Sequence, residues 1–556
     1  MDLHAIAASQ KPARKSRAKT PKESEKPIAT IDFETDPFLY GRIPYPFSAG
    51  FYSQDKGFVC FWGADCVARL CEYVATLKTP HIIYAHNGGK FDFHYMLDFL
   101  QNPLKIISNR IASVKMGIHT LRDSYCILPI PLRVYCKDEI DYKKLEADVR
   151  ETHKDEIIAY LKTDCVKLHE LVMKFIFRFG VKLTIGGTAI AKLQELHPFK
   201  KTFETHDNHY RPFYFGGRVE ALKTGILKGD WKVYDVNSMY PHVMRDYQHP
   251  TGLRYRVGYG RNIDVKGRIA GFADAQFYFA RIRATQRGAF PTRERDKPLN
   301  FDVKRGEFFV TSHELKAAIA CGRVSDIQVL AVYVPEKTIS FGEYVDTYVA
   351  EKIASKKSGD KAGEIFAKLL LNSAYGKFGS NPREYKDYVI GDCPNDDYEL
   401  YSAGVNRPSI WRKATERLSF YDVATAASIT GAARSVLMRA LSVAKNPVYC
   451  DTDSIICEGL DLELDESKLG AWKLEAIGDT VAIAGKKMYA LRNGSDYVKT
   501  ASKGVVLTGP ELFGLCDGTG IHWHNQAPSF SLGKKSANFV QRKIKGVESS
   551  LPISAI

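Results

Sequence analysis

The sequence predicts a large chain of several domains that combines α/β and α+β folds. Its 556 residues are enough for about three to four domain-sized units with sizeable cores. Strand-like runs and a long amphipathic helix fall in the N-terminal third, and further strands, a helix and a short hairpin follow. Acidic residues stand at the ends of several of these predicted elements, which points to sites for divalent cations.

A predicted hairpin near the C-terminal end carries two of these acidic residues. Apolar residues flank the run Tyr-Cys-Asp-Thr-Asp-Ser at 449–454, so we expect two short strands joined by a tight turn. Residues two apart in an extended chain point to the same side, which aims the carboxylates of Asp451 and Asp453 at one point. Such an arrangement repels unless a cation lies between the two groups.

Two further segments supply partners for this hairpin. The run 231–236 alternates as a strand does and brings Asp235 to its C-terminal end, before Pro241. The run 361–375 has helical periodicity, with Lys361, Lys368, Asn372 and Tyr375 on one stripe beside an apolar face. We expect the apolar face to pack and the polar stripe to remain accessible.

A second set of acidic residues fills the N-terminal third. Asp32 and Glu34 share one face of the predicted strand 28–35, and Asp92 follows the run Ala-His-Asn-Gly-Gly at 85–89. Tyr160 and Asp164 are four apart on a predicted helix and therefore share a face.

The three C-terminal segments together resemble the polymerase motifs of family B DNA polymerases, in the family's order. These motifs are the Asp-bearing strand before Ser-Met-Tyr-Pro at 238–241, the Lys-x-x-x-Asn-Ser-x-Tyr-Gly helix at 368–376 and the Tyr-x-Asp-Thr-Asp hairpin at 449–453. The resemblance implies a right-hand polymerase with palm, fingers and thumb. Nucleotide addition is an in-line displacement at an α-phosphate, which two divalent ions can serve.

The resemblance also implies roles for individual residues. Asp235 and Asp453 are expected to bind two Mg²⁺ ions, with Mn²⁺ as an alternative, together with the Val236 carbonyl and with Asp451 in support. Lys368 is expected to neutralise the triphosphate of the incoming dNTP, with Asn372 beside it and Lys356 or Lys361 as a second, weaker cation. Tyr240 is expected under the sugar, where it excludes a 2′-hydroxyl, and Tyr375 against the new base pair. The alternative for both tyrosines is packing in a core.

The N-terminal set resembles the DEDD class of 3′–5′ exonucleases, which implies an RNase H-like domain. Asp32, Glu34, Asp92 and Asp164 are then expected to hold two metal ions, and Tyr160 to orient the attacking water. The alternative is a solvated acidic face. Weaker expectations are that the frayed 3′ end contacts His86, Asn87, Phe91 and Ser124, and that Lys137 assists phosphate hydrolysis. An ordinary surface role for Lys137 remains open.

Two motifs and the chain length narrow the resemblance to the compact, protein-primed branch of phages, adenoviruses and linear plasmids. Tyr214, Gly216 and Gly217 fit a Tyr-x-Gly-Gly loop that touches the template, and Lys487 and Tyr489 fit a Lys-x-Tyr motif that grips the primer terminus. This branch starts synthesis on a hydroxyl of a terminal protein. The expected partners are therefore template and primer DNA, dNTPs and a terminal protein.

The resemblance suggests a division of the chain into eight parts. A basic, disordered tail is expected first, and 246–345 is expected to dock the terminal protein. For 381–412, a hairpin for strand displacement and processivity and a flexible acidic loop are both open. The expected parts are tail 1–26, exonuclease 27–190, linker and first palm segment 191–245, insertion 246–345, fingers 346–380, second insertion 381–412, palm 413–480 and thumb 481–556.

Charge and composition agree with nucleic-acid binding. The formal net charge is +15, as expected of a surface that follows phosphates. The eleven cysteines include no Cys-x-x-Cys pair and so predict no zinc site. The sequence has neither a signal peptide nor a run of eighteen apolar residues, so we expect a cytoplasmic protein without a membrane span. The resemblance to polymerases of phages and plasmids implies the cytoplasm of a bacterial host.

The sequence predicts a proofreading DNA polymerase that replicates a linear genome from a terminal-protein primer. One alternative is a family B polymerase that extends ordinary primers or needs none. Another, from a different class, is a catalytically silent DNA-binding protein on the same fold. Every expected carboxylate is present, which disfavours the silent protein, and the Lys368 helix has no role in a pure nuclease.

Overall fold

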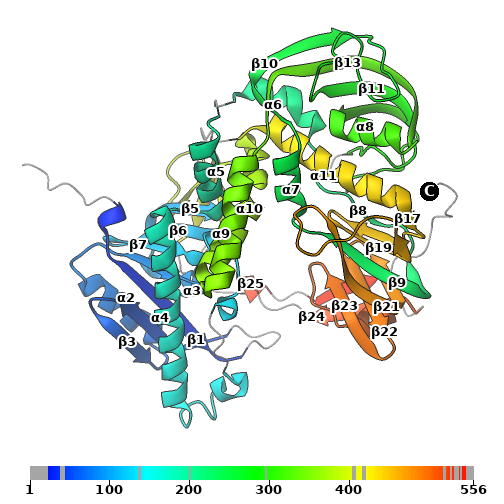
Figure 1. Cartoon of the computed structure of the whole chain (residues 1–556). Helices are drawn as coiled ribbons and strands as arrows, with labels where there is room; N and C mark the ends of the chain where they lie inside the picture. The colour runs from blue at the N-terminus through cyan, green and yellow to red at the C-terminus, as the bar shows by residue number, and fades with distance from the viewer. Residues whose placement is uncertain are drawn as a thin grey trace, which may run out of the picture.

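The computed structural model describes residues 23–37, 44–135, 140–199, 202–294, 297–403, 408–415, 421–517, 521–525, 529–530, 537–538 and 541–545. Figure 1 shows an N-terminal domain in blue and cyan and a C-terminal sheet in orange, on opposite sides of the molecule. Green and yellow helices lie between them, and a third sheet lies above the yellow helix.

The N-terminal domain is built on a mixed sheet with helices on both faces. Strand β1 (Ile28–Thr35) is central, antiparallel to β2 (Pro46–Ser53) and parallel to β4 (Ile82–Ala85). Because side chains alternate along β1, Ile28 packs with helix α4 (Lys154–Phe179) and Ile31 with α2 (Cys66–Thr76) on the other face. The sheet also contains β3 (Gly57–Trp62), β5 (Gln101–Ile107), β6 (Arg110–Met116) and β7 (His119–Asp123).

The C-terminal sheet has seven strands in the order β23-β22-β21-β9-β19-β18-β8. Its centre is β9 (Gly225–Val236), which pairs antiparallel with both β19 (Ser454–Cys457) and β21 (Trp472–Gly485). Short β18 (Tyr449–Asp451) joins β19 through the predicted hairpin. The outer strands are β8 (Val219–Ala221), β22 (Met488–Asn493) and β23 (Asp496–Ser502).

A four-stranded antiparallel sheet occupies the expected insertion 246–345. Its order is β10-β13-β11-β12, with β10 at His249–Tyr259, β11 at Phe279–Gln286, β12 at Arg305–Thr311 and β13 at Val324–Ile339. Helix α8 (Ser312–Ala320) follows β12 and packs on α11 (Val423–Val443). The segment is therefore a folded unit with its own core.

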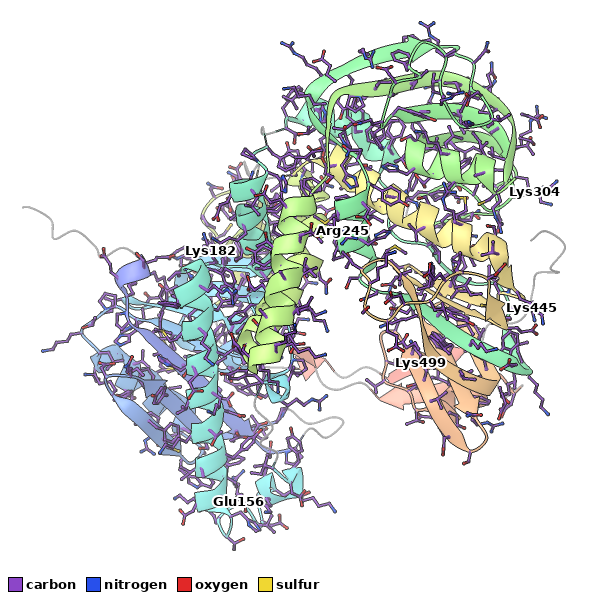
Figure 2. The ribbon with its side chains drawn as sticks, viewed as in Figure 1. Glu156, Lys182, Arg245, Lys304, Lys445 and Lys499 are labelled. Atoms are coloured by element: carbon purple, nitrogen blue, oxygen red, sulfur yellow. The ribbon has the colours of Figure 1, made fainter. Side chains whose placement is uncertain are left out.

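One shared core joins the N-terminal domain to the helices and to the C-terminal sheet. It contains residues of α4, α5 (Ile185–Leu196), α7 (Met239–Asp246), α9 (Gly342–Ser358), α10 (Lys361–Phe378) and α11, with Val236 and Ile455 of the C-terminal sheet. On α10, Ala362, Phe366 and Leu370 are buried whereas Lys361, Lys368 and Asn372 are exposed, as the helical pattern predicts. At the end of α7, Arg245, labelled in Figure 2, lies 3.7 Å from Asp346 of α9.

The second insertion forms three strands that extend the N-terminal sheet. β14 (Lys386–Ile390) pairs with β16 (Ile410–Ala414), which pairs with β15 (Glu399–Ser402). β14 in turn lies beside β5, with Tyr388 opposite Leu104. The Asn102 side chain accepts from the Ile390 amide at 2.9 Å and donates to the Ile390 carbonyl at 2.8 Å. The sheet consequently has ten strands.

Some element boundaries differ from the expected divisions. Helix α9, which covers the start of the expected fingers segment, begins at Gly342, inside the expected insertion. The expected palm–thumb boundary at 481 falls within β21, and the same sheet continues to Ser502 because β22 and β23 pair onto it. Of the expected basic tail 1–26, residues 1–22 lie outside the described residues.

Several small elements complete the described chain. Between the N-terminal domain and β8 lies α6 (Glu204–Tyr210). Helix α3 (Asp92–Tyr95) begins at the predicted acidic residue Asp92. Beyond β23 come α12 (Gly509–Gly514) and the strand pairs β24–β27 and β25–β26, at Ile521–Asn525, Gln541–Lys545, Ser529–Phe530 and Ala537–Asn538. β17 (Ala444–Lys445) pairs with β20 (Gly459–Leu460). Among the described residues, no helix is both long and apolar enough to cross a bilayer.

Replacing Phe366 tests whether the shared core holds the domains together. Its ring lies 5.5 Å from Phe175 and 5.9 Å from Phe179 of α4 and is 1% exposed. Phe366→Ala should lower the free energy of unfolding by about 3–5 kcal/mol, because it leaves a cavity between α10 and α4. The measurement is the denaturant midpoint followed by circular dichroism. Phe177→Ala is the matched control, since Phe177 is 94% exposed on α4. Equal midpoints for both variants would contradict this assignment of the core.

Candidate active sites

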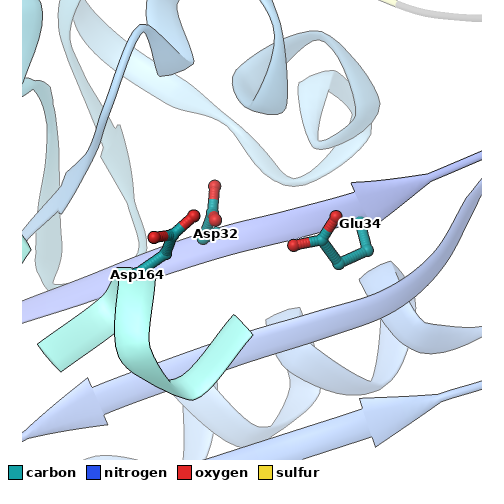
Figure 3. Close-up of side chains that lie close together, drawn as sticks. All are labelled: Asp32, Glu34 and Asp164. Carbon is teal, nitrogen blue, oxygen red and sulfur yellow. The ribbon is translucent and has the colours of Figure 1, made fainter. Parts of the chain in front are cut away.

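Three acidic side chains of the N-terminal domain meet at one point. Asp32 and Glu34 leave the same face of β1, and Asp164 reaches them from α4 (Figure 3). Each offers a carboxylate oxygen, and these oxygens lie within 4.8 Å of one another. The alternation along β1 and the packing of α4 on it therefore build the cluster that the sequence predicts.

Burial and mutual repulsion make this cluster unfavourable when its groups are ionised. Burial, followed by the charges of Asp92, Asp164 and Glu34, raises the pKa of Asp32 well above its ordinary value. Burial raises the pKa of Glu34 to about 8, with help from Asp164 and Asp92, and raises that of Asp92 to about 7. A bound divalent cation would relieve both effects.

Asp92 and Tyr160 complete the expected set. Asp92 is 2% exposed, and its Oδ1 atom has no hydrogen-bond partner among the described residues. Asp92 is not among the three side chains whose oxygens lie within 4.8 Å of one another, but its charge acts on Asp32 and Glu34. An orphaned buried carboxylate oxygen near this cluster suits a metal ion, so these residues fit the predicted ligand set. Tyr160 lies one helical turn before Asp164. Burial, followed by the Asp164 charge, raises the pKa of Tyr160, and the side chains of Tyr160 and Asp164 also share a hydrogen bond.

The segment 85–92, which ends at Asp92, is held largely by internal hydrogen bonds. His86 uses Nδ1 with the Ser124 hydroxyl at 3.0 Å and Nε2 with the Ile130 carbonyl at 2.9 Å. Burial lowers the pKa of His86 to about 4, so its ring is neutral near pH 7. Ser124 is 0% exposed, and its hydroxyl oxygen lies 3.2 Å from the Ala85 carbonyl oxygen, a buried position that argues against the direct DNA contact expected of it. Phe91 packs edge-on against Tyr95.

A buried ion pair that sequence patterns missed supports this segment. Arg110 of β6 donates to Asp123 of β7 at 2.5 Å and to the Asn87 side chain at 3.1 Å. Asp123 also accepts from the Gly89 backbone. At Gly89 a Cβ would lie 2.3 Å from the Ile111 carbonyl, so only glycine fits there. Lys137, expected near this site, lies outside the described residues.

In the C-terminal sheet, strand pairing places the other predicted carboxylates together. Asp235 of β9 lies opposite Ser454 of β19, and the Val236 amide donates to the Asp453 carbonyl at 2.8 Å. Thr452 takes a left-handed conformation, φ +52°, in the tight turn between Asp451 and Asp453. Burial, then the charges of Asp235 and Asp451, raises the pKa of Asp453 to about 6.

Neighbouring charges distinguish the three aspartates. The Lys487 ammonium donates to both carboxylate oxygens of Asp451, at 2.9 Å and 2.7 Å. Asp451 is therefore already paired, which agrees with a supporting role. The Asp235 carboxylate lies 3.8 Å from the Lys473 ammonium. Burial, followed by the Glu475 charge, nevertheless raises the pKa of Asp235. Glu475 is itself ion-paired with Lys499, labelled in Figure 2.

The Lys-x-Tyr motif is divided between the site and the core. Lys487 takes a left-handed conformation, and its backbone amide donates to the Tyr449 hydroxyl at 2.9 Å. Tyr489 is 5% exposed, and its ring packs 4.9 Å from that of Tyr449. In this structure Tyr489 thus supports the hairpin from within the sheet, and Lys487 is the residue that reaches the carboxylates.

Tyr375 of α10 and Tyr240 of α7 lie close to the same site. The rings of Tyr240 and Tyr375 stack in parallel, with centroids 3.7 Å apart. The pKa values of both tyrosines are raised, first by burial and in smaller part by the Asp453 charge. Lys361, Lys368 and Asn372 are exposed on α10, and Lys356 is exposed on α9. Residues predicted from three separate motifs therefore lie around Asp453.

The Tyr-x-Gly-Gly segment bridges α10 and the hairpin turn. A Cβ on Gly379, just past α10, would lie 2.5 Å from the Tyr214 hydroxyl. A Cβ on Gly217 would lie 2.6 Å from the Thr452 hydroxyl, so glycine permits this close approach. The Gly216 carbonyl accepts from Arg434 of α11 at 2.7 Å. Sequence motifs located this segment but not the arginine beneath it.

Comparison with known proteins identifies the family. Residues 132–464 match the family described as DNA polymerase type B, organellar and viral. The chain is 42% identical over 569 residues to a DNA-directed DNA polymerase of Enterobacteria phage PRD1, covering 96% of this chain and 100% of that protein. It is 27% identical over 481 residues to the DNA polymerase of Bacillus phage phi29, covering 73% and 77% of the two chains.

A solved structure supports the same fold. It is that of phi29 DNA polymerase complexed with primer-template DNA and incoming nucleotide substrates, with a TM-score of 0.69 at 18% identity over 94% of this chain and 100% of that one. The predicted mixed multidomain fold and the predicted membership of family B are confirmed. The chain belongs to the organellar and viral family of type B DNA polymerases.

Proposed function

We propose that the site around Asp235 and Asp453 adds dNTPs to a primer on a DNA template. The observation that carries this proposal is the meeting of three motifs: β9 beside the hairpin, and the Tyr240–Tyr375 stack that brings α10 against them. Family membership supplies the reaction class, and the bound primer-template and nucleotides of the phi29 structure supply the substrate class.

Individual residues divide the task. Mg²⁺ ions bound by Asp235 and Asp453, with the Val236 carbonyl, would stabilise negative charge on the transferring phosphate. The exposed Lys368 would bind the triphosphate, with Asn372 and Lys361 on the same stripe and Lys356 on α9. The Tyr240–Tyr375 pair is an apolar wall on which a sugar and a base can rest. Lys487 pairs with both carboxylate oxygens of Asp451, which agrees with a supporting role for Asp451.

We propose that the N-terminal cluster removes misincorporated nucleotides from the 3′ end. Asp32, Glu34, Asp92 and Asp164 would hold Mg²⁺ or Mn²⁺, and Tyr160, hydrogen-bonded to Asp164, would orient a water. Asn87 and Phe91 would contact the frayed strand. A second site that removes the errors of the first increases fidelity beyond what one binding step gives.

We propose priming by a terminal protein, in the cytoplasm of a bacterial host, during replication of a linear genome. The support is the likeness to two phage polymerases and the separately folded sheet at 246–345, which offers a docking unit. The charge of +15 suits the DNA partner. Extension of an ordinary primer is the alternative that the priming experiment tests.

The two active sites should be separable by mutation. Asp453→Ala should lower primer extension by about 10³-fold or more, because electrostatic stabilisation at the phosphate is lost, and should leave degradation of single-stranded DNA intact. Asp32→Ala with Asp92→Ala should do the reverse. Both activities are measured on labelled oligonucleotides with Mg²⁺. If folded variants of either kind lose both activities together, the assignment of two sites is wrong.

Metal binding to the N-terminal cluster should strengthen with pH. The folded pKa values of Glu34, about 8, and Asp92, about 7, exceed the ordinary values of 4.5 and 3.8. At pH values between the ordinary and the raised pKa, the metal-free folded protein holds protons that the unfolded chain has lost. The stability of the folded protein therefore falls as pH rises. Divalent ions bind the deprotonated groups, so the rise in Tm on adding Mn²⁺ should be larger at about pH 8 than at about pH 6.

A matched variant assigns that pH effect. Glu34→Gln with Asp92→Asn removes two of the titrating groups, while Asp32 remains, and should reduce the pH dependence of the Mn²⁺-induced Tm shift. Thermal melts in EDTA and in Mn²⁺ measure it. An equal shift at both pH values in the unmutated protein would contradict the protonation of this cluster.

Protein priming is tested by labelled-dNTP incorporation in two parallel reactions. One contains a primed single-stranded template, and the other contains an unprimed template with the candidate terminal protein. We expect an extended primer in the first and a nucleotide linked to protein in the second. Extension without the protein-linked product would leave a polymerase that uses ordinary primers.

A further inference from the structure

Arg110 of β6 is a buried cation to which the functions proposed above assign no role. The side chain is 9% exposed, and its Nη1 atom donates to Asp123 Oδ2 at 2.5 Å and to Asn87 Oδ1 at 3.1 Å. The guanidinium carbon also lies 4.4 Å from the centre of the Tyr125 ring. One side chain thus joins the end of β7, the turn that follows it and the segment 85–92.

The partner of Arg110 is held in place by backbone groups. Asp123 is 2% exposed, and its Oδ1 atom accepts from the Tyr125 amide at 2.9 Å. Its carboxylate also accepts from the Gly89 amide, and a Cβ on Gly89 would lie 2.8 Å from Asp123 Oδ2. The position of this carboxylate, and with it that of the Arg110 guanidinium, is therefore determined by β7 and by the segment 85–92.

Asn87 has an unusual backbone conformation beside this ion pair. It is half-buried and left-handed, with φ +63°, and it begins the tight turn Gly88–Lys90. Because a guanidinium only donates hydrogen bonds, the side-chain oxygen of Asn87 must face Arg110. The Nδ2 group, which is a donor, then faces away from Arg110. The arginine thereby decides which end of the amide is available to a ligand.

These contacts lie beside the proposed exonuclease site. The turn that starts at Asn87 leads directly to Asp92, the first residue of α3. The charge of Asp123 acts on Asp92, and that of Asp92 acts on Asp32. Arg110 and Asp123 consequently support the one segment that carries both a predicted metal ligand and an expected contact with the DNA strand.

We propose that Arg110, held by Asp123, is a positioning residue for the exonuclease that orients the Asn87 amide, so that Nδ2 donates to an acceptor of the frayed 3′ strand. Apolar residues of similar volume often replace a buried ion pair without loss of stability, so stability alone does not explain this pair. Its distinguishing feature is that one nitrogen serves both the buried carboxylate and a polar side chain that remains partly exposed. The inference rests on the proposed exonuclease function and deepens it.

Arg110→Lys is the first variant to measure. The lysine ammonium lies one bond closer to the backbone than Nη1, so it keeps a charge near Asp123 but loses the reach to Asn87 and the flat contact with Tyr125. We expect KM for a labelled single-stranded oligonucleotide, degraded with Mg²⁺, to rise about 10-fold, the effect of about one lost hydrogen bond, with kcat within about twofold. Primer extension and Tm should change little. An unchanged KM would overturn the proposal.

A double-mutant cycle tests whether Arg110 acts through Asn87. Asn87→Ala alone should raise KM by a similar factor, because it removes the donor itself. Adding Arg110→Lys to Asn87→Ala should then raise KM by less than about twofold, since the oriented amide is already absent. Effects that multiply to about 100-fold would show that Arg110 acts independently of Asn87 and would refute the positioning role.

Two further variants guard against misfolding and nonspecific effects. Arg110→Gln with Asp123→Asn removes both charges together and decides the matter if Arg110→Lys unfolds. KM should again rise, because glutamine is too short to reach Asn87, and an unmutated KM in this pair would refute the role. Arg69→Met, at an exposed arginine of α2, is the matched control and should change neither KM nor kcat.

The same assay separates this inference from the function on which it rests. If the unmutated protein fails to degrade single-stranded DNA, the proposed exonuclease function fails. If the unmutated protein degrades it and Arg110→Lys does so with the same KM, only the positioning role fails. A loss of both degradation and primer extension with a lowered Tm in Arg110→Lys would show a structural ion pair and would also reject positioning.

Discussion

The antiparallel pairing of β9 with β19 is the interaction on which the polymerase site depends. It sets Asp235 opposite Ser454 and joins the Val236 amide to the Asp453 carbonyl, so two carboxylates distant in sequence become neighbours. A shift of one residue in this register would turn Asp235 to the other face of the sheet. The pairing of β9 with β21 on its other edge holds the strand in that register.

Both proposed active sites place like charges close together and differ in how the repulsion is offset. In the C-terminal sheet, Lys487 pairs with Asp451 and Lys473 lies near Asp235. In the N-terminal cluster, burial and the neighbouring carboxylates raise the pKa values of Asp32 and Glu34, and these groups are more deeply buried. Stored repulsion of this kind makes a site ready for a divalent ion, because binding removes an existing cost.

Local patterns were sufficient to predict the individual motifs. Residues two apart on β1 and four apart on α4 share a face by geometry, so Asp32 with Glu34, and Tyr160 with Asp164, could be grouped from sequence. The exposed stripe of α10 followed from its helical period. The fold class was likewise predictable, since the motifs occur in the order of a known family.

Contacts between distant segments were not predictable in this way. Arg434 of α11 and the Gly216 carbonyl that it binds are 218 residues apart. The burial of Ser124 and Tyr489 depends on neighbouring strands, which no pattern within their own segments reveals. The same limit applies to β21, whose continuous pairing with β9 and β22 crosses the expected palm–thumb boundary.

The docking of β14 on β5 has a consequence for solubility. Without the segment 386–414, β5 would become the outermost strand of the N-terminal sheet and would present a row of unpaired amides and carbonyls. Such a strand is a template for pairing with another chain. Because β14 lies beside β5, this edge of the N-terminal domain is not open to such pairing. The outermost strand is instead the short β15, where Glu399 pairs with Arg412.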